Sequence, residues 1–190
     1  MKLVIGILLV IFSIVIVVTT YFPLAKNEVE YQLNKTKGQN IEEITPLSRE
    51  FGIVIPKLGI NVKVIKNVNS YDANVYQKAL TQGVAHAEGT NLPGEDGNIF
   101  IFSHSSENFY EAVRYNSIFY LLPKLEIGDT ITLYFEGKRF DYHVREKIIA
   151  NPDEVSFLTD KSEKPMLTLM TCYPPGTNLK RFIVVADLTL

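Results

Sequence analysis

The chain has 190 residues, of which 46% are hydrophobic and 21% are charged. This composition is that of a globular protein, and the length predicts one domain with accessory segments. A formal net charge of −2 and the lack of a Lys- and Arg-rich run give no reason to expect a nucleic acid partner. The single cysteine excludes an intramolecular disulfide, and the three histidines show no metal-ligand spacing. We therefore expect neither a metal nor a cofactor.

The amino terminus carries an apolar stretch over residues 3–20, LVIGILLVIFSIVIVVTT, that no charge interrupts. A helix of about 20 such residues crosses the hydrocarbon core of a bilayer. The competing interpretation is a cleaved signal peptide, whose apolar region is usually only about 7–15 residues and ends in a small-x-small site. We expect an uncleaved signal anchor over residues 1–23. A polar stalk over 24–50 should follow it. Lys2 places the amino terminus in the cytoplasm and the rest of the chain outside the cell.

Residues 51–190 consist of short β-rich segments between turns, which predicts a single, mainly β domain. The clearest feature is a hairpin over 130–146, in which apolar and polar residues alternate on both sides of a turn at 136–138. Two short helices are expected, at about 72–81 and about 107–122. Several short strands with few helices predict a closed β-barrel or a sandwich.

The lone cysteine ends one of these β segments. Pro174, Pro175 and Gly176 follow it closely and cannot continue a strand. Cys172 is thus predicted at a strand end, where a reactive side chain is held rigidly but stays accessible. A thiol needs a nearby cation or imidazole to ionise near neutral pH. Arg181 begins the next β segment, so neighbouring strands would bring it to Cys172. A buried apolar cysteine and a surface arginine are the alternatives.

The three histidines differ in their predicted surroundings. His104 ends the apolar segment 98–103 and precedes a probable helix start, so it also lies at a strand-to-loop junction. A Cys and a His that are distant in sequence but joined in the fold form the usual pair for thiol catalysis. His86 lies in a glycine-flanked, loop-like stretch, where it is either a polar loop residue or part of a pocket edge. His143 is expected on the solvated face of the hairpin.

These segments resemble the sortase family of cysteine transpeptidases. The stretch TLMTC with Arg181 downstream resembles the signature T-L-x-T-C followed by an arginine, and GNIFIFSH resembles the segment that ends in the family's histidine. IPKLGINVKV, GVAHAEGTNLPGEDGN and GDTITLYFEGKRFDYHV resemble framework segments of the family. The resemblance covers nearly all of residues 51–190, in family order.

The resemblance implies an eight-stranded closed β-barrel with short helices after the membrane anchor. It also implies cleavage of an LPxTG-type sorting signal between Thr and Gly. Cys172 would attack the Thr carbonyl, His104 would serve as acid and then base, and Arg181 would position the substrate and stabilise the oxyanion. Thr171 would line the substrate pocket. His86 is expected at the pocket's edge because of its position in the glycine-flanked stretch, not because of the resemblance. The implied partners are secreted proteins with a sorting signal and an amine acceptor, such as a peptidoglycan precursor or a pilin lysine.

Several features depart from the commonest family pattern. Ser103 stands where many members have Gly before the histidine, no second hydrophobic segment follows the domain, and the stalk lacks an Asp-Pro-aromatic lid motif. The pattern is closest to single-anchor members of the class D or E kind. Asp153, Glu154 and Asp160 lie where some relatives bind calcium, but scattered loop carboxylates are usually solvated, so no calcium site is predicted. The alternative functions are a thiol hydrolase and a non-catalytic, membrane-tethered β-domain.

Overall fold

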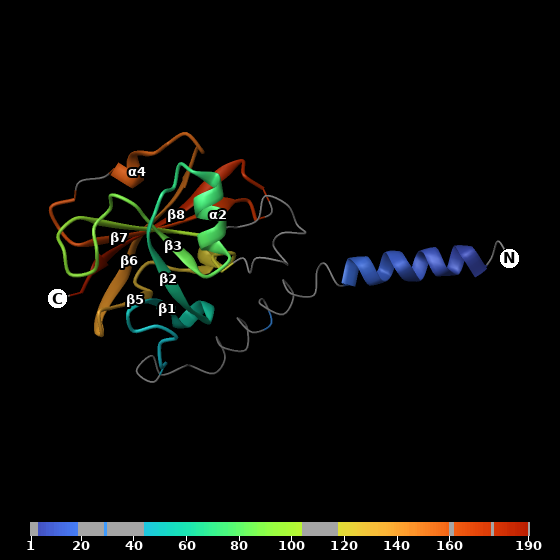
Figure 1. Ribbon diagram of the computed structural model, residues 1–190, viewed down its shortest axis with the longest axis horizontal. Helices are drawn as coiled ribbons and strands as arrows, with labels where there is room; N and C mark the ends of the chain where they lie inside the picture. Colours follow the sequence, from blue (N-terminus) through green and yellow to red (C-terminus); the bar gives the residue numbers. More distant parts are fainter. Residues whose placement is uncertain are drawn as a thin grey trace.

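A closed β-barrel forms the body of the protein (Figure 1). The computed structural model describes residues 4–18, 29, 44–103, 118–159, 162–175 and 177–189. Eight strands follow one another around the barrel in the order β1-β2-β3-β4-β7-β8-β6-β5, and β5 pairs with β1 to close it. The pairs β2–β3 and β4–β7 are parallel, and the other pairs are antiparallel. The predicted barrel is therefore confirmed over the predicted sandwich.

The strands are rich in β-branched and aromatic residues, which fit a pleated and half-buried surface. Short helices occupy some of the connections between them. The strands are β1 (Phe51–Ile55), β2 (Ile60–Val68), β3 (Val84–Ala87), β4 (Asn98–Phe102), β5 (Thr130–Phe135), β6 (Lys138–Ala150), β7 (Met166–Tyr173) and β8 (Lys180–Leu188). The helices are η2 (Pro56–Leu58), α2 (Ala73–Leu80), η3 (Leu122–Lys124) and α4 (Ser156–Thr159).

The hairpin expected over 130–146 is present as β5 and β6. Its turn is the two-residue loop Glu136-Gly137, since Phe135 pairs directly with Lys138. Both turn residues have positive φ, 50° and 80°, which suits the right-handed twist of the flanking strands. Glu136 and Gly137 also donate their amides to the carbonyls of residues 50 and 49, so the segment that enters β1 is bonded to this end of the barrel.

One of the two predicted helices is confirmed, and the other is only partly described. Asp72 caps α2 through its carboxylate, which accepts hydrogen bonds from the amides of Asn74 and Val75. The second helix was expected over 107–122, and residues 107–117 lie outside the described residues. Residues 118–121 form turns that lead into the 3-10 helix η3. Pro123 lacks the amide hydrogen that a continued α-helix would need there.

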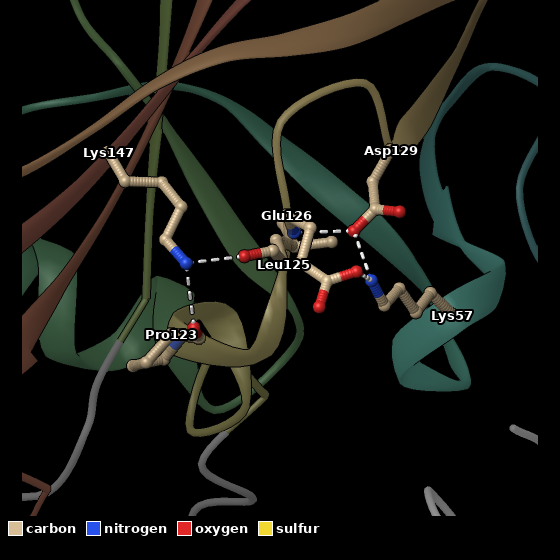
Figure 2. A network of polar contacts seen from close by, with 6 residues as sticks. All are labelled: Lys57, Pro123, Leu125, Glu126, Asp129 and Lys147. Atoms are coloured by element: carbon tan, nitrogen blue, oxygen red, sulfur yellow. Dashed lines mark hydrogen bonds and ion pairs between the residues drawn. The ribbon is translucent and has the colours of Figure 1, made fainter.

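The segment after residue 118 fills the barrel interior instead of lying on its surface. Phe119, Leu122 and Leu125 are fully buried in the main core, together with inward-facing side chains of every strand. Burying one such side chain contributes roughly 1.5–3 kcal/mol relative to leaving it exposed. Lys147 on β6 fixes this segment further, because its ammonium group donates to the carbonyls of Pro123 at 3.1 Å and Leu125 at 2.5 Å (Figure 2).

A second lysine holds the turn that follows. Lys57 in η2 contacts the carboxylates of Glu126 at 2.6 Å and Asp129 at 2.8 Å (Figure 2). Partial burial alone would lower the pKa of Lys57, but the hydrogen bonds to Asp129 and Glu126 outweigh it and raise that pKa above 10.5. Lys57 therefore stays charged, and the connection from η3 to β5 is bonded to η2, which precedes β2.

The amino-terminal helix covers residues 4–18, and the side chains of these residues are exposed. Within the part of the chain that the structure describes, no helix combines the length and the apolar composition that crossing a membrane requires. The remainder of the predicted anchor, residues 1–3 and 19–23, lies outside the described residues. The same holds for the predicted stalk from 24 to 43, apart from residue 29.

His86 lies in β3, not in the loop that the sequence indicated, and it is completely buried. Its Nδ1 accepts a hydrogen bond from the amide of Asn67 at 3.2 Å, so the ring proton resides on Nε2. Nε2 lies 3.0 Å from both the carbonyl of Asn91 and the hydroxyl of Thr90. The imidazole therefore joins β2 to the β3–β4 connection. Desolvation is the main cause of its pKa lying below the usual 6.5.

These bonds predict a pH-dependent cost for the His86→Gln substitution. At pH 7.5 it should lower the free energy of unfolding by about 1–3 kcal/mol, because buried partners lose their hydrogen bonds. Below pH 6.5, His86 binds a proton in the unfolded parent, whereas its lowered pKa keeps it neutral in the folded parent. Protonation therefore favours the unfolded state and lowers the free energy of unfolding of the parent, but not that of the variant, which lacks the imidazole. The difference between parent and variant should therefore shrink at pH 5.0.

The measurement is denaturant unfolding of the full chain in detergent at both pH values. His143→Gln is the matched control, because it removes an imidazole from a different strand. A gap between parent and His86→Gln that is the same at pH 7.5 and 5.0 would contradict the assigned role.

Candidate active site

Cys172 and Arg181 lie directly opposite each other at the ends of two paired strands. The antiparallel register of β7 and β8 pairs Met170 with Ile183 and Cys172 with Arg181. Opposite residues of an antiparallel pair project from the same face of the sheet, with Cα atoms only ~4.5–5.5 Å apart. The sequence predicted neighbouring strands for these two residues, and the register shows that they are direct partners.

The strand alternation places the thiol on the outer face of the barrel. Leu167 and Leu169 belong to the interior core, whereas Met166 and Met170 pack into clusters on the outer face. Because successive side chains alternate, Cys172 shares the face of Met170. Cys172 is a free cysteine, and the residue is partly exposed.

The guanidinium of Arg181 is held by its own loop. Nη1 donates to the carbonyls of Asn178 at 3.1 Å and Lys180 at 3.2 Å. Within the described residues, the Arg181 guanidinium forms no ion pair with a carboxylate and uses only Nη1 in hydrogen bonds. Among the described residues Nε and Nη2 have no acceptor, so they can act as charged donors on the face that carries Cys172. Such donors suit a carbonyl oxygen that develops negative charge.

The end of β4 lies beside the same part of β7. Phe102 pairs with Met170 in parallel register, and the amide of Ser103 donates to the carbonyl of Met170 at 3.2 Å. Ser103 itself is buried. His104 follows immediately in the chain but lies outside the described residues.

Thr171 lines the barrel interior, on the opposite face of β7 from Cys172. It is 2% exposed and pairs with Phe182, which belongs to the interior core. Within the described residues its hydroxyl oxygen has no hydrogen-bond partner. The period of two along a strand explains this position, since the residue before an outward-facing cysteine must face inward.

The other two histidines lie away from the thiol. The bonds of His86 leave neither ring nitrogen available to a substrate in this arrangement. His143 pairs with Asp187, six positions along β8 from Arg181, or ~20 Å at the usual rise per residue. It was expected to face solvent, but it is half-buried. Its Nε2 is shielded without a hydrogen-bond partner in the described part of the chain.

The three carboxylates considered for calcium, Asp153, Glu154 and Asp160, lie in the connection between β6 and β7. Asp153 and Glu154 are exposed, and Asp160 lies outside the described residues. Across the described ranges, no group of three or more His, Cys, Asp or Glu side chains is arranged to hold a metal ion.

A buried polar pair on the outer face was not predicted from the sequence. Asn98, the first residue of β4, is 2% exposed and accepts a hydrogen bond from the hydroxyl of Thr168 at 2.8 Å. Its amide nitrogen donates to the carbonyl of Phe157 in α4 at 2.7 Å. The sequence contains one indication of this pair, a polar residue at the start of an otherwise apolar segment. That pattern is equally typical of a strand boundary, so it did not predict a buried asparagine.

The comparison with known proteins agrees with this architecture. Residues 53–189 match the sortase domain family. The chain is 28% identical to sortase D of Bacillus subtilis (strain 168) over 133 residues, which are 68% of this chain and 59% of that protein. Thus the chain spans only about three fifths of the length of this relative.

Two solved structures from Clostridium perfringens have the same fold. A sortase D5 transpeptidase is 24% identical, with a TM-score of 0.62 over 87% of this chain and 95% of that chain. A sortase C solved with its C-terminal cell wall sorting motif is 26% identical, with a TM-score of 0.62 over 88% of each chain. Since the family match covers the barrel from Ile53 onward, including both partners of the Cys172–Arg181 pair, the chain belongs to the sortase family, whose members are cysteine transpeptidases.

Proposed function

We propose that this protein is a membrane-anchored transpeptidase. It cleaves an LPxTG-type sorting signal at its Thr-Gly bond and transfers the protein to an amine acceptor. The observation that carries the proposal is the register of β7 and β8, which pairs the free thiol of Cys172 with Arg181 on the outer face of the barrel. Membership of the sortase family supports the reaction class.

The chemistry follows from the two paired residues. The Cys172 thiolate attacks the Thr carbonyl carbon and forms a C–S bond, and the carbonyl electron pair moves onto oxygen. Arg181 donates hydrogen bonds to that oxyanion through the nitrogens that its loop carbonyls leave free. When the oxyanion collapses, the C–N bond breaks and a thioester remains on Cys172. The acceptor amine then attacks the thioester, and the thiolate leaves.

We assign the proton transfers to His104. The leaving Gly amine needs a proton, and the incoming amine must lose one, so a single imidazole can serve both steps in turn. Parallel pairing of β4 and β7 aligns Phe102 with Met170. His104 lies two residues beyond Phe102, and Cys172 lies two residues beyond Met170. This register supports His104 as the imidazole nearest the thiol, whereas His143 is paired further along the barrel.

The acceptor decides between transfer and hydrolysis. We propose an amine of the cell wall, such as a peptidoglycan precursor, or a pilin lysine. The substrates are secreted proteins that end in a sorting signal. The solved sortase C with its cell wall sorting motif supports this substrate class for the family.

The apolar amino terminus suggests where the enzyme works. The described helix over 4–18 lies within the uncharged stretch 3–20, and its side chains are exposed. We propose that this stretch is an uncleaved signal anchor with the amino terminus in the cytoplasm and the barrel outside. An extracellular barrel would be on the side where secreted substrates and cell wall acceptors occur.

The first prediction concerns the catalytic pair. The full chain in detergent, incubated with an LPxTG peptide, should form a thioester adduct visible by mass spectrometry and, with an amine present, a transfer product. Cys172→Ala should form no adduct. His104→Ala should lower kcat/KM by about 10²–10⁴-fold, because general acid–base catalysis is lost.

His143→Ala is the matched control for the imidazole and should stay within a few-fold of the parent. An adduct in Cys172→Ala would exclude the assigned nucleophile. If the peptide is only hydrolysed, and an added amine gives no transfer product, the protein is a thiol hydrolase. If the parent forms no adduct at all, the protein is a non-catalytic domain.

The second prediction concerns Arg181. The substitution Arg181→Lys keeps the positive charge but removes the planar donor array, so it should lower kcat by about 10²–10³-fold. Lys180→Arg, at the adjacent exposed position, is the matched control and should change kcat little. If Arg181→Lys retains a near-normal kcat, catalysis needs only a positive charge at this position and not the planar guanidinium.

The third prediction concerns topology. Protease added to intact cells should digest the barrel, because the proposed anchor leaves it outside. A reporter fused before residue 1 should remain protected. A mature protein that begins near residue 26 would show that the apolar stretch is a cleaved signal peptide.

A further inference from the structure

Residues 44–50 form a strap that is bonded to the barrel before the chain enters β1. The Oδ1 of Asn61 in β2 accepts a hydrogen bond from the amide of Leu47 at 2.8 Å, and its Nδ2 donates one to the carbonyl of Thr45 at 2.9 Å. With one acceptor and one donor, this side chain binds the strap as the backbone of a neighbouring strand would. Pro46, between the two bonded residues, is buried.

The strap runs in the opposite direction to β1. Ser48 lies directly against β1 at Gly52, because a Cβ on Gly52 would overlap the carbonyl oxygen of Ser48. Thr45 lies further along β1, since its partner Asn61 pairs with Val54. Followed backwards from Ser48 to Thr45, the chain therefore travels from the start of β1 towards its end.

The end of β1 lies at the end of the barrel that carries the candidate active site. β1 is antiparallel to β2, β2 is parallel to β3, β3 is antiparallel to β4, and β4 is parallel to β7. β1 and β7 therefore run in the same direction, and β7 reaches Cys172 near its end. In the closed order of eight strands β1 and β7 are four places apart, so they form opposite walls of the barrel.

Three apolar side chains are exposed at the same end of the barrel. β5 and β8 begin there and β6 ends there, because β5 and β8 run against β1 and β7, and β6 runs against β5. Ile127 precedes β5, Leu179 precedes β8, and Ile149 is the last residue but one of β6. They are 65%, 66% and 55% exposed. Exposed apolar side chains that gather on one surface mark contact with a partner or a membrane.

We propose that the strap fixes the orientation of the barrel, so that the end with Cys172 faces the bilayer that holds the anchor. Asn61 closes the strap, and the chain then leaves the barrel at Thr45, on the wall opposite β7 and in the direction of the active-site end. Without the strap, the anchor would be joined to the barrel at the far end, where β1 begins. This inference rests on the proposed signal anchor.

The lipid surface is thus the partner of the active-site end. The apolar side chains of that end suit contact with the interfacial region of a bilayer, whereas the β5–β6 turn at the other end consists of Glu136 and Gly137. An orientation that is fixed in advance lowers the entropic cost of bringing Cys172 to a reactant at the membrane surface.

The chain allows a direct measurement of this orientation, because Cys172 is its only cysteine and takes a single maleimide fluorophore. The full chain is reconstituted in vesicles of phosphatidylcholine and phosphatidylglycerol that contain a lipid with an acceptor dye. A second label position is made by Lys138→Cys in a Cys172→Ala background. Lys138 is exposed at the start of β6, at the opposite end of the barrel.

We expect energy transfer to the lipid to be about twofold or more stronger from the Cys172 label than from the label at position 138, because β6 alone spans ~40 Å between the two ends. Asn61→Ala removes both bonds of the strap, so it should reduce this difference. Amide hydrogen exchange over residues 45–50 should become faster in the same variant, since Leu47 loses its acceptor.

Asn69→Ala is the matched control. Asn69 is an exposed asparagine whose Oδ1 also accepts from a backbone amide, that of Tyr71 at 2.9 Å, but it does not contact the strap. This variant should keep the parent's difference in energy transfer and its exchange over residues 45–50.

Two results would overturn the inference. If the vesicle-bound parent transfers energy from the Cys172 label no better than from position 138, the active-site end does not face the bilayer, and its apolar side chains are left to a protein partner. If Asn61→Ala changes neither the energy transfer nor the exchange, or if Asn69→Ala changes both as much, the strap does not fix the orientation.

Failure of the anchor gives a different result. In that case the parent does not float with the vesicles, and both the anchor and the orientation are excluded. If the parent floats but the two labels transfer energy equally, the anchor stands and only the orientation fails. Should Asn61→Ala not fold, Asn61→Asp replaces it, because aspartate keeps the acceptor for Leu47 but cannot donate to the carbonyl of Thr45.

Discussion

The parallel pairing of β4 with β7 joins the first half of the barrel to the second, and the candidate site is built along it. β4 is buried on both faces, as is usual for strands with parallel partners. Ile99 and Ile101 face the interior core, while Phe100 and Phe102 face an outer cluster that α2 and α4 cover. A shift of one residue would reverse both faces, so this burial on two sides specifies the register strongly.

The same register decides which side of the barrel is chemically active. In the observed pairing Cys172 faces outward beside Arg181, and Thr171 faces inward beside Phe182. A slip of one residue would bury the thiol in the core and bring a hydroxyl to the outer face. The apolar packing of β4 and β7 therefore supports reactivity indirectly, by keeping the thiol on the accessible face.

Three polar side chains of the strands bind the connections between strands. His86 joins β2 to the β3–β4 connection, Lys147 binds the carbonyls of the segment that fills the interior, and Asn98 binds α4. His86 and Asn98 are buried, where an unmade hydrogen bond costs about 1–3 kcal/mol. Because breaking these hydrogen bonds is unfavourable, the connections keep defined positions although they contain little regular structure.

Local sequence patterns determined much of the barrel. The hairpin of β5 and β6 follows from period-two alternation around a Glu-Gly turn, and α2 follows from its Asp72 cap. His86 was misplaced in a loop because the glycines around it were interpreted as turn residues. Gly83 in fact permits close approach of two strands, since a Cβ there would lie 2.3 Å from the carbonyl of Lys63. A glycine needed for a turn and one needed for close packing look alike in a sequence.

Local sequence patterns indicated that a lone cysteine ends a strand before a proline-rich loop and that an arginine begins the next strand. These features depend on nearest neighbours along the chain, which is why pattern and turn chemistry disclose them. The folded barrel was needed to show that Cys172 and Arg181 are direct partners on the outer face and that Thr171 faces the interior. It was also needed to show that Asn98 binds a carbonyl 59 positions away in the chain. Pairing between distant segments is selected by the burial of both faces of the sheet together, and no local stretch of sequence contains that information.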